Sequence, residues 1–296
     1  MTPGPDYAGE NLLFVAGCPR SGTTWVQRLL SCHPAIHTGQ ETHIFNHYLM
    51  PVETAWRRSK AGSPRGVGLA GYFSDEQFHQ VLKSFLVSLL SPLVAPLAPG
   101  EFFLEKTPSN ALFMPEITGF LPAARIIHVL RDPRDVVASL LAASRSWGRR
   151  WAPRNARRAI TTWKEHVGGV REASRNLPPS QFMEIRYEDL HADPERVLRS
   201  CITFLGLEWS DEQLRSAISA NEPEKAVTEN GGTPIPIGGE LGARFGGMAK
   251  EPKGFIRKAK VGSWKQDLNP ADKFWIWMLA RKQMTANGYP WRSAPK

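Results

Sequence analysis

Short apolar runs and segments with helical spacing alternate along this chain. The runs have the length and continuity of strands buried on both faces. They cover 12–16, 102–104, 125–130 and 182–186, with a further short one at 35–38. Strands that alternate with helices favour a parallel sheet with helices on both faces. Ligands of such sheets lie beyond the carboxyl ends of the strands. We therefore predict an α/β fold of three layers, a central parallel sheet flanked by helices, whose post-strand loops converge on one crevice.

Helices are predicted from apolar residues three and four positions apart and from capping residues. Their expected starts are near Thr23, Ser74, Val136, Asn155, Asp193, Ser210 and Asn269. Residues 1–10 are expected to form a flexible N-terminal tail and residues 11–296 a single domain. The glycine-rich segment 222–254 has little periodicity and is predicted to be a long functional loop or lid.

The first strand leads into a glycine loop with the form of a phosphate cradle. Gly17 and Gly22 stand at the spacing of a P-loop, and helical spacing starts at Thr23. A strand, a glycine loop and a helix together place free backbone N–H groups and a helix N-terminus in front of an anion. Thr23 occupies the position of the P-loop lysine, and the cation is instead Arg20 inside the loop. The fold is therefore expected to be P-loop-like, with a modified phosphate site.

The composition is that of a basic globular protein. The chain has 296 residues, 42% of them hydrophobic, which is enough to bury a sizeable core, and its formal charge of +9 implies attraction to anions. Its three cysteines form no metal-type pair and indicate a reducing compartment without disulfides. No apolar run has membrane-spanning length and no leader-like segment is recognised, so the expectation is a cytoplasmic protein without membrane contact.

The glycine loop also carries a family resemblance. The segment Pro-Arg-Ser-Gly-Thr-Thr-Trp at 19–25 resembles the 5′-phosphosulfate loop of the sulfotransferases that use 3′-phosphoadenosine 5′-phosphosulfate (PAPS). Many soluble members carry lysine where this chain has Arg20. The resemblance implies that the donor is PAPS, held by Arg20, Ser21, Gly22, Thr23 and Thr24.

A second segment, 131–139, resembles the signature that holds the 3′-phosphate of PAPS in this family. The resemblance implies that Arg131 and Ser139 are the phosphate ligands. An arginine offers a planar fork of donors, and a serine hydroxyl two turns further along a helix reaches the same anion.

The segment 254–265 resembles the C-terminal signature of the family, and it implies that Arg257 and Lys258 add charge at the 3′-phosphate. Ala259 stands where the family has glycine, and its backbone N–H is the implied contact. The stretch Tyr-Glu-Asp-Leu that begins at Tyr187 resembles another segment of the family. It implies that Tyr187 and Trp25 lie against the adenine, since flat rings suit flat bases.

The catalytic base is implied by a likeness to the carbohydrate sulfotransferases. The stretch Glu-Thr-His-Ile-Phe-Asn that begins at Glu41 resembles their Glu-x-His-Phe-Phe-Asp, and Asn46 stands where those enzymes have aspartate. In those enzymes the glutamate is the general base, and the lysine of a Glu-Lys-Thr-Pro segment lies close by; residues 105–108 match that segment. The resemblance implies Glu41 as the base, His43 as its support or as an alternative base, and Lys106 as a charge near the sulfuryl group.

Six arginines are interleaved with tryptophans in residues 145–158, namely Arg145, Arg149, Arg150, Arg154, Arg157 and Arg158 with Trp147 and Trp151. A nucleic-acid or polyanion surface would have such a composition. A solvated helix face is the favoured interpretation, because binding of PAPS already accounts for much of the basic character. No nucleic-acid partner is therefore predicted.

The three cofactor segments occur in the family's order between residues 12 and 265, and the chain is identified as a member of the PAPS-dependent sulfotransferases. The expected reaction is a single in-line displacement at sulfur, without a metal, onto a hydroxyl of a small-molecule or saccharide acceptor. A homodimer is left open. The alternative is a P-loop nucleotide-dependent kinase, against which stand the missing loop lysine and a second basic site that ATP does not need.

Overall fold

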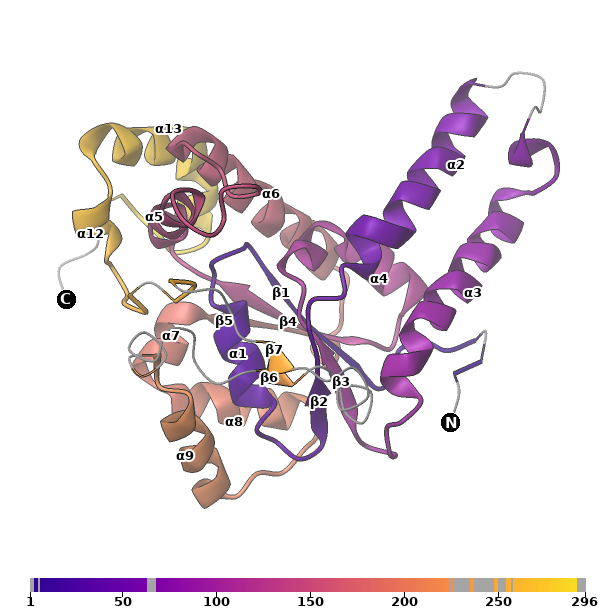
Figure 1. Cartoon of the computed structure of the whole chain (residues 1–296), viewed down its shortest axis with the longest axis horizontal. Helices are drawn as coiled ribbons and strands as arrows, with labels where there is room; N and C mark the ends of the chain where they lie inside the picture. Colours follow the sequence, from indigo (N-terminus) through magenta and orange to yellow (C-terminus); the bar gives the residue numbers. More distant parts are fainter. Residues whose placement is uncertain are drawn as a thin grey trace.

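The computed structural model describes residues 3–4, 6–62, 68–223, 225, 235–236, 248–249, 254–256 and 258–291. Its centre is a five-stranded sheet in the order β2-β3-β1-β4-β5, and each neighbouring pair is parallel (Figure 1). The strands are β1 (Leu12–Gly17), β2 (Ile36–Thr38), β3 (Phe102–Glu105), β4 (Arg125–Leu130) and β5 (Phe182–Arg186). This sheet confirms the predicted α/β fold with a central parallel sheet.

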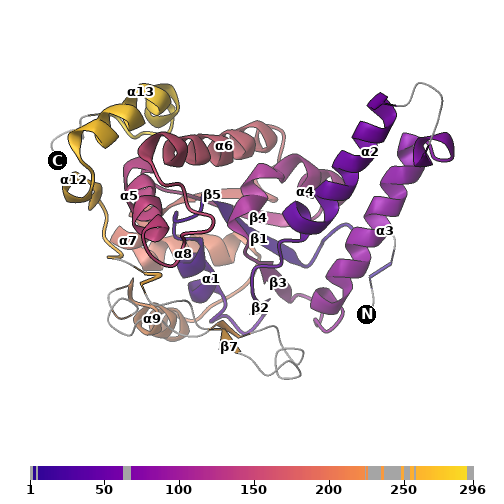
Figure 2. The ribbon, with the colours of Figure 1, turned by 45° about the horizontal axis from the view of Figure 1, so that its top comes forward.

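Helices cover both faces of the sheet because successive residues of β1 point to opposite sides. The helices concerned are α1 (Thr23–Leu30), α3 (Asp75–Val94), α4 (Met114–Phe120), α6 (Ala156–Ser174), α8 (Pro194–Phe204) and α9 (Asp211–Ala220). Leu13 and Val15 share a hydrophobic core with α1, α8 and α9, whereas Leu12 and Phe14 share another with α3, α4 and α6. In Figure 2, α6 runs above the sheet and α9 lies below it. The three layers are therefore those predicted.

A third hydrophobic core lies beside the end of β4. It joins Leu130 to helices α5 (Pro133–Ser144) and α13 (Pro270–Ala286) and to Trp163 of α6. The short helices α7 (Tyr187–Ala192) and α12 (Trp264–Asp267) complete this side of the domain. These elements surround the loops that follow β1, β4 and β5.

Helix α2 (Met50–Gly62) and helix α3 form a pair that projects from the body (Figure 1). Trp56 of α2 stacks on Phe78 of α3, with ring centroids 4.0 Å apart and planes 8° apart. A π-helix, Ile44–Leu49, leads into α2, and a single 3₁₀ turn, Leu69–Gly71, precedes α3. The pattern of apolar residues in the sequence predicts neither α2 nor the π-helix.

One difference from the predicted helices has a local cause, and one helix is continuous through a pair of glycines. Helix α5 begins at Pro133, before the expected Val136, because the Asp132 side chain accepts a hydrogen bond from the backbone N–H of Arg134 at 2.8 Å and caps the helix. Helix α6 continues through its glycine pair. A Cβ atom on Gly169 would lie 2.8 Å from a backbone oxygen of the 3₁₀ segment Pro108–Leu112, so glycine permits this close packing.

Only part of the predicted lid, 222–254, lies within the described residues. There, the strands β6 (Ile235–Pro236) and β7 (Met248–Ala249) form an antiparallel pair. Within the parts of the chain that the structure describes, no helix is both long and apolar enough to cross a membrane.

Candidate active site

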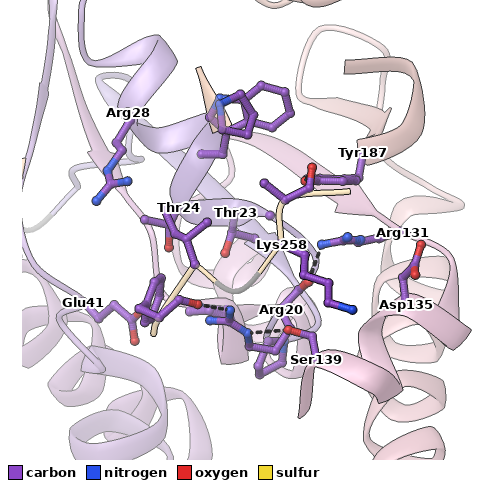
Figure 3. A pocket seen from close by; sticks show the side chains of 18 of the residues that line it. Arg20, Thr23, Thr24, Arg28, Glu41, Arg131, Asp135, Ser139, Tyr187 and Lys258 are labelled. Atoms are coloured by element: carbon purple, nitrogen blue, oxygen red, sulfur yellow. Dashed lines mark hydrogen bonds between the residues drawn. The ribbon is translucent and has the colours of Figure 1, made fainter. Parts of the chain in front are cut away.

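The loops that follow the five strands line one cavity of about 660 Å³. Each loop contributes to the cavity wall: Arg20 follows β1, Glu41 follows β2, Ser109 follows β3, Arg131 follows β4 and Tyr187 follows β5. The side chains labelled in Figure 3 surround this space. The predicted convergence of the post-strand loops is therefore present, and the volume suits a nucleotide together with a second small molecule.

The glycine loop leaves the N-terminus of α1 open toward the cavity. Gly22 is the N-cap residue of α1, has φ 100°, and provides no side-chain cap. A Cβ atom on Gly22 would lie 2.4 Å from the ring of Tyr187, so glycine is required both by backbone angle and by space. Thr23 and Thr24 line the cavity in the first turn of α1. Free N–H groups and the helix dipole make this terminus a site for an anion.

Ser21, unlike its neighbours, does not line the cavity. Its side chain is buried, and its backbone N–H donates a hydrogen bond to the carbonyl of Cys18 at 2.9 Å. The residue shapes the loop from beneath.

Arg20 lies across the middle of the cavity. Its Nε donates a hydrogen bond to Oγ of Ser139 at 3.1 Å, and its Nη2 donates to the carbonyl oxygen of Phe255. The guanidinium lies 4.6 Å from the ring centroid of Phe255 and 5.3 Å from that of Trp147. Its φ of 77° is in the left-handed region, which costs a non-glycine residue roughly 1–3 kcal/mol. The fold therefore holds this cation in a strained but well-contacted position.

A second basic group lies on the far side of the glycine loop. Arg131 donates from Nη1 to the carbonyl of Arg20 at 3.2 Å, and its guanidinium lies 3.7 Å from the ring centroid of Tyr187. Its Nε is buried and has no hydrogen-bond partner among the described residues. Ser139 and Lys258 also line this part of the cavity (Figure 3). The predicted 3′-phosphate residues are thus brought together from two distant segments, except Arg257, which lies outside the described residues.

The C-terminal basic segment is tied to α5 by a buried carboxylate. Asp135 accepts hydrogen bonds from the backbone N–H of Gly262 at 2.7 Å and of Trp264 at 2.9 Å. Lys258 pairs with Asp267 at 2.6 Å. Ala259, which stands where the family has glycine, has φ 51°, so the backbone keeps the left-handed form that glycine favours.

Two aromatic rings form a corner beside the glycine loop. The ring centroids of Trp25 and Tyr187 are 5.6 Å apart, and their planes are inclined by 63°. The Nε1 of Trp25 donates a hydrogen bond to the carbonyl of Asn221 at 2.8 Å. The predicted adenine residues are therefore neighbours, although they stand edge to face and are not parallel.

The Glu41 carboxylate is shared between a lysine and a histidine. Lys106, whose side chain is buried, donates a hydrogen bond to Oε1, and Nε2 of His43 lies 3.4 Å from Oε2. Burial alone would raise the pKa of Glu41. The hydrogen bonds and charges of His43 and Lys106 outweigh it and hold that pKa at about 2. Glu41 is therefore ionised at neutral pH. Lys106 does not itself line the cavity and reaches Glu41 from behind.

His43 has an unusual backbone and two polar contacts. Its φ is 52°, and the amide nitrogen of Asn46 donates to Nδ1 at 3.3 Å, which leaves the Nε2 hydrogen for Glu41. The ring stacks on His47, with centroids 4.6 Å apart. The hydrogen bond to Glu41 raises the pKa of His43 above its ordinary value, although burial acts in the opposite direction. Glu41 and His43 thus form a coupled pair at the cavity wall.

Several cavity residues are missed by sequence analysis. Trp147 and Trp151 line the cavity, with centroids 5.4 Å apart. They lie in the connection between α5 and α6, so the predicted solvated helix face is wrong for most of the arginine-rich stretch, and only Arg157 and Arg158 stand on α6. The interleaving of tryptophan with arginine was the available sign, but spacing alone does not show which way a loop folds.

His166 of α6 is a further missed residue, and it lines the cavity although almost wholly buried. Its Nδ1 donates to the carbonyl of Thr162 at 2.7 Å, and burial lowers its pKa to about 4, so the ring is neutral. Arg28, one turn after Thr24 on α1, also lines the cavity (Figure 3).

Comparison with known proteins gives a consistent match. Residues 13–211, more than half of the chain, match the model of the sulfotransferase family. A protein-tyrosine sulfotransferase of Drosophila melanogaster is 26% identical over 212 residues, which are 72% of this chain and 41% of that protein. The chain spans about half the length of the curated relatives it matches.

Two solved structures share the fold. A mouse sulfotransferase in complex with PAP has a TM-score of 0.62 at 16% identity, covering 95% of this chain and 86% of that one. The sulfotransferase domain of an olefin synthase from Synechococcus PCC 7002 has a TM-score of 0.57 at 18% identity, covering 100% and 99%. The resemblance found in the sequence, to the sulfotransferases that use PAPS, is confirmed.

The same comparison corrects the predicted cytoplasmic location. The curated relatives are protein-tyrosine sulfotransferases, and similarity to them contradicts the predicted cytoplasmic location. That prediction rested on three cysteines and on the lack of a recognisable leader or anchor. Such features describe redox chemistry and hydropathy, and they do not determine where a chain resides.

Proposed function

Because the chain belongs to the sulfotransferase family, we propose that it moves the sulfuryl group of PAPS to a hydroxyl acceptor. The products are a sulfate ester and adenosine 3′,5′-bisphosphate (PAP). The observation that carries this proposal is the pairing of two anion sites in one cavity. The open N-terminus of α1 suits the 5′ end of the donor, and the group around Arg131 and Ser139 suits the 3′-phosphate.

PAPS supplies an activated sulfuryl group with a phosphate as leaving group. The acceptor oxygen forms the new S–O bond while the bond between sulfur and the phosphate oxygen breaks. In the proposed arrangement the loop N–H groups and Arg20 stabilise the charge that grows on the leaving phosphate oxygen. The contact of Arg20 with Ser139 supports this role, because it places the guanidinium between the two anion sites.

We propose that the proton of the acceptor hydroxyl is transferred to the pair formed by Glu41 and His43. Glu41 lies at the cavity wall as an ionised carboxylate, which supports its role as the receiving group. A pKa of about 2 makes it a weak base, and general bases work best with a pKa near the operating pH. His43, whose pKa is raised, is the alternative acceptor of the proton.

We propose a small-molecule or saccharide acceptor, as the likeness of the Glu41 segment to the carbohydrate enzymes implies. A tyrosyl phenol is a second candidate. It is supported by the aromatic wall of Trp147, Trp151 and Phe255 beside Arg20, and by the name of the curated relatives. An aromatic wall contributes to binding of a flat ring by offset or edge contacts.

The experiment that tests the proposal is incubation of the purified chain with PAPS and a panel of acceptors. The panel contains 4-nitrophenol, a tyrosine-containing peptide and a glucosamine oligosaccharide, and mass spectrometry records an added sulfo group and the release of PAP. Transfer to any one acceptor that disappears in Arg131→Ala supports the activity and names the acceptor class. If neither PAP nor a sulfated product forms in any of the mixtures, although the chain is folded, the proposed activity is contradicted.

A further inference from the structure

Glu105 is the last residue of β3, and its carboxylate accepts several hydrogen bonds. Its Oε1 accepts from the backbone N–H of Thr42 at 3.2 Å, from the Thr42 hydroxyl at 2.8 Å and from the Thr107 hydroxyl at 2.5 Å. The side-chain amide of Asn110 donates to Oε2. Glu105 is 2% exposed and does not line the cavity. It therefore acts on other residues of the chain and not on a bound molecule.

One partner of Glu105, Thr42, neighbours in the chain the two residues that are proposed to receive the proton. Thr42 stands between Glu41 and His43, and both of its donors end on Glu105. The backbone N–H of His43 donates to Oγ1 of Thr107 at 3.4 Å, and that hydroxyl in turn donates to Glu105. Two consecutive backbone N–H groups are thus fixed, directly or through one hydroxyl, by a single carboxylate.

This fixation matters because His43 has a left-handed backbone, with φ 52°. A non-glycine residue keeps such a conformation only where its surroundings determine it. The N–H groups of Thr42 and His43 would otherwise be free to turn toward water, and the side chains on either side would turn with them. A displacement of about 1 Å at a catalytic group can cost roughly a hundredfold in rate.

We infer that Glu105 is a positioning residue that fixes Glu41 and His43 against the cavity by holding the backbone of Thr42 and His43. The inference rests on the proposed function for its kinetic consequence, but its structural content stands apart from it. Sequence resemblance assigned no role to this glutamate, although it precedes Lys106 in the matched segment.

Two substitutions of nearly equal volume separate positioning from core filling. In Glu105→Gln the remaining Oε1 keeps the three donors of Thr42 and Thr107, and the Asn110 amide turns to offer its oxygen. In Glu105→Met all these donors lose their acceptor. Glu101→Gln, at the residue before the same strand and paired with His37, is the matched control.

Hydrogen exchange of the amides at 41–43 and the PAP-induced rise in Tm are measured for each variant, and turnover is measured with PAPS and the acceptor panel. For Glu105→Met we expect amide exchange to rise about tenfold or more. The PAP-induced shift should be retained, because none of the hydrogen-bond partners of Glu105 is a proposed donor ligand. Turnover should fall about a hundredfold in kcat with the KM for PAPS unchanged. Glu105→Gln should keep most of the amide protection and most of the turnover that Glu105→Met loses. Glu101→Gln should resemble the wild type.

Unchanged exchange at 41–43 in Glu105→Met, or equal loss in the Gln and Met variants, overturns the inference. If Glu105→Met does not fold, Thr42→Val supplies the test, since it removes one donor and should raise exchange at the same amides. Unchanged amide exchange in Thr42→Val would likewise overturn the inference. Absence of turnover in the wild type, with the exchange difference present, contradicts the proposed function and leaves the positioning role in place.

Discussion

Arg20 and Ser139 are joined by a hydrogen bond of 3.1 Å from Nε to Oγ, although 119 positions separate them in the chain. The two residues come from different segments, the glycine loop after β1 and helix α5 after β4, which are proposed to hold different anionic groups. The bond therefore couples the part of the cavity proposed for the 5′ end of PAPS to the part proposed for its 3′-phosphate. A ligand that occupies only one of the two parts gains only part of this basic environment.

Nucleotides should accordingly be distinguished by their 3′-phosphate. PAP should raise the Tm clearly, whereas AMP at the same concentration should barely change it. Arg131→Ala should weaken PAP binding about tenfold to a hundredfold, since a hydrogen bond to a charged group contributes roughly 1.5–3 kcal/mol. Thermal shift and calorimetry measure both. Equal stabilisation by PAP and AMP would contradict the second anion site.

Substitution of the proposed base should remove transfer and spare donor binding. Glu41→Gln keeps the shape and should lower kcat about 10²–10⁴-fold, with PAP affinity nearly unchanged. His43→Gln should have a smaller effect if His43 only supports Glu41. Single-turnover rates and PAP titrations decide between the two. Retained turnover in Glu41→Gln together with its loss in His43→Gln would move the base to His43.

The pKa of His43 should depend on Glu41. Since the hydrogen bond to Glu41 is the largest cause that raises it, Glu41→Gln should lower the pKa of His43, as followed by NMR titration of its ring. A raised folded-state pKa means that protonated His43 stabilises the fold below its ordinary value of 6.5. This contribution is lost as the pH rises through the folded-state pKa. The free energy of unfolding, measured in urea over that pH range, should thus decline less in Glu41→Gln than in the wild type.

Transfer should not depend on Mg²⁺. A P-loop kinase holds its metal beside the hydroxyl that follows the loop lysine, and here Thr23 stands in place of that lysine. Turnover with PAPS should be the same in EDTA and in Mg²⁺, because Arg20 and the N-terminus of α1 supply the positive charge directly. Loss of activity in EDTA that Mg²⁺ restores would favour the kinase alternative.

Asp135 should act on nucleotide binding through the loop that it anchors. Asp135→Asn leaves one oxygen for the backbone N–H groups of Gly262 and Trp264, which now use both. We expect PAP to bind about tenfold more weakly, since one such hydrogen bond is worth about 1 kcal/mol or more when its partner is left buried. Asp211→Asn, an exposed site on α9, is the control. Equal PAP affinity in the two variants would show that the hydrogen bonds accepted by Asp135 do not contribute to PAP binding.

The sequence by itself determined the sheet and the glycine loop, because both depend on local features. Continuous apolar runs form buried strands wherever the chain folds, and the turn at Gly22 needs a residue free to adopt φ 100°. The family resemblance of their segments also singled out Arg20 and Arg131, and each lies in the loop that follows such a strand. In a parallel sheet those positions meet at one edge.

Only the tertiary structure decided which side chains touch across that edge. Trp147 and Trp151 line the cavity because the connection between α5 and α6 folds over it, and their spacing in the chain does not specify that path. The network from Glu105 to His43 depends on β3 lying beside β2, so that a strand end meets the loop of its neighbour. Contacts between segments far apart in the chain carry no periodicity, and they exist only once the sheet order has set which loops are adjacent.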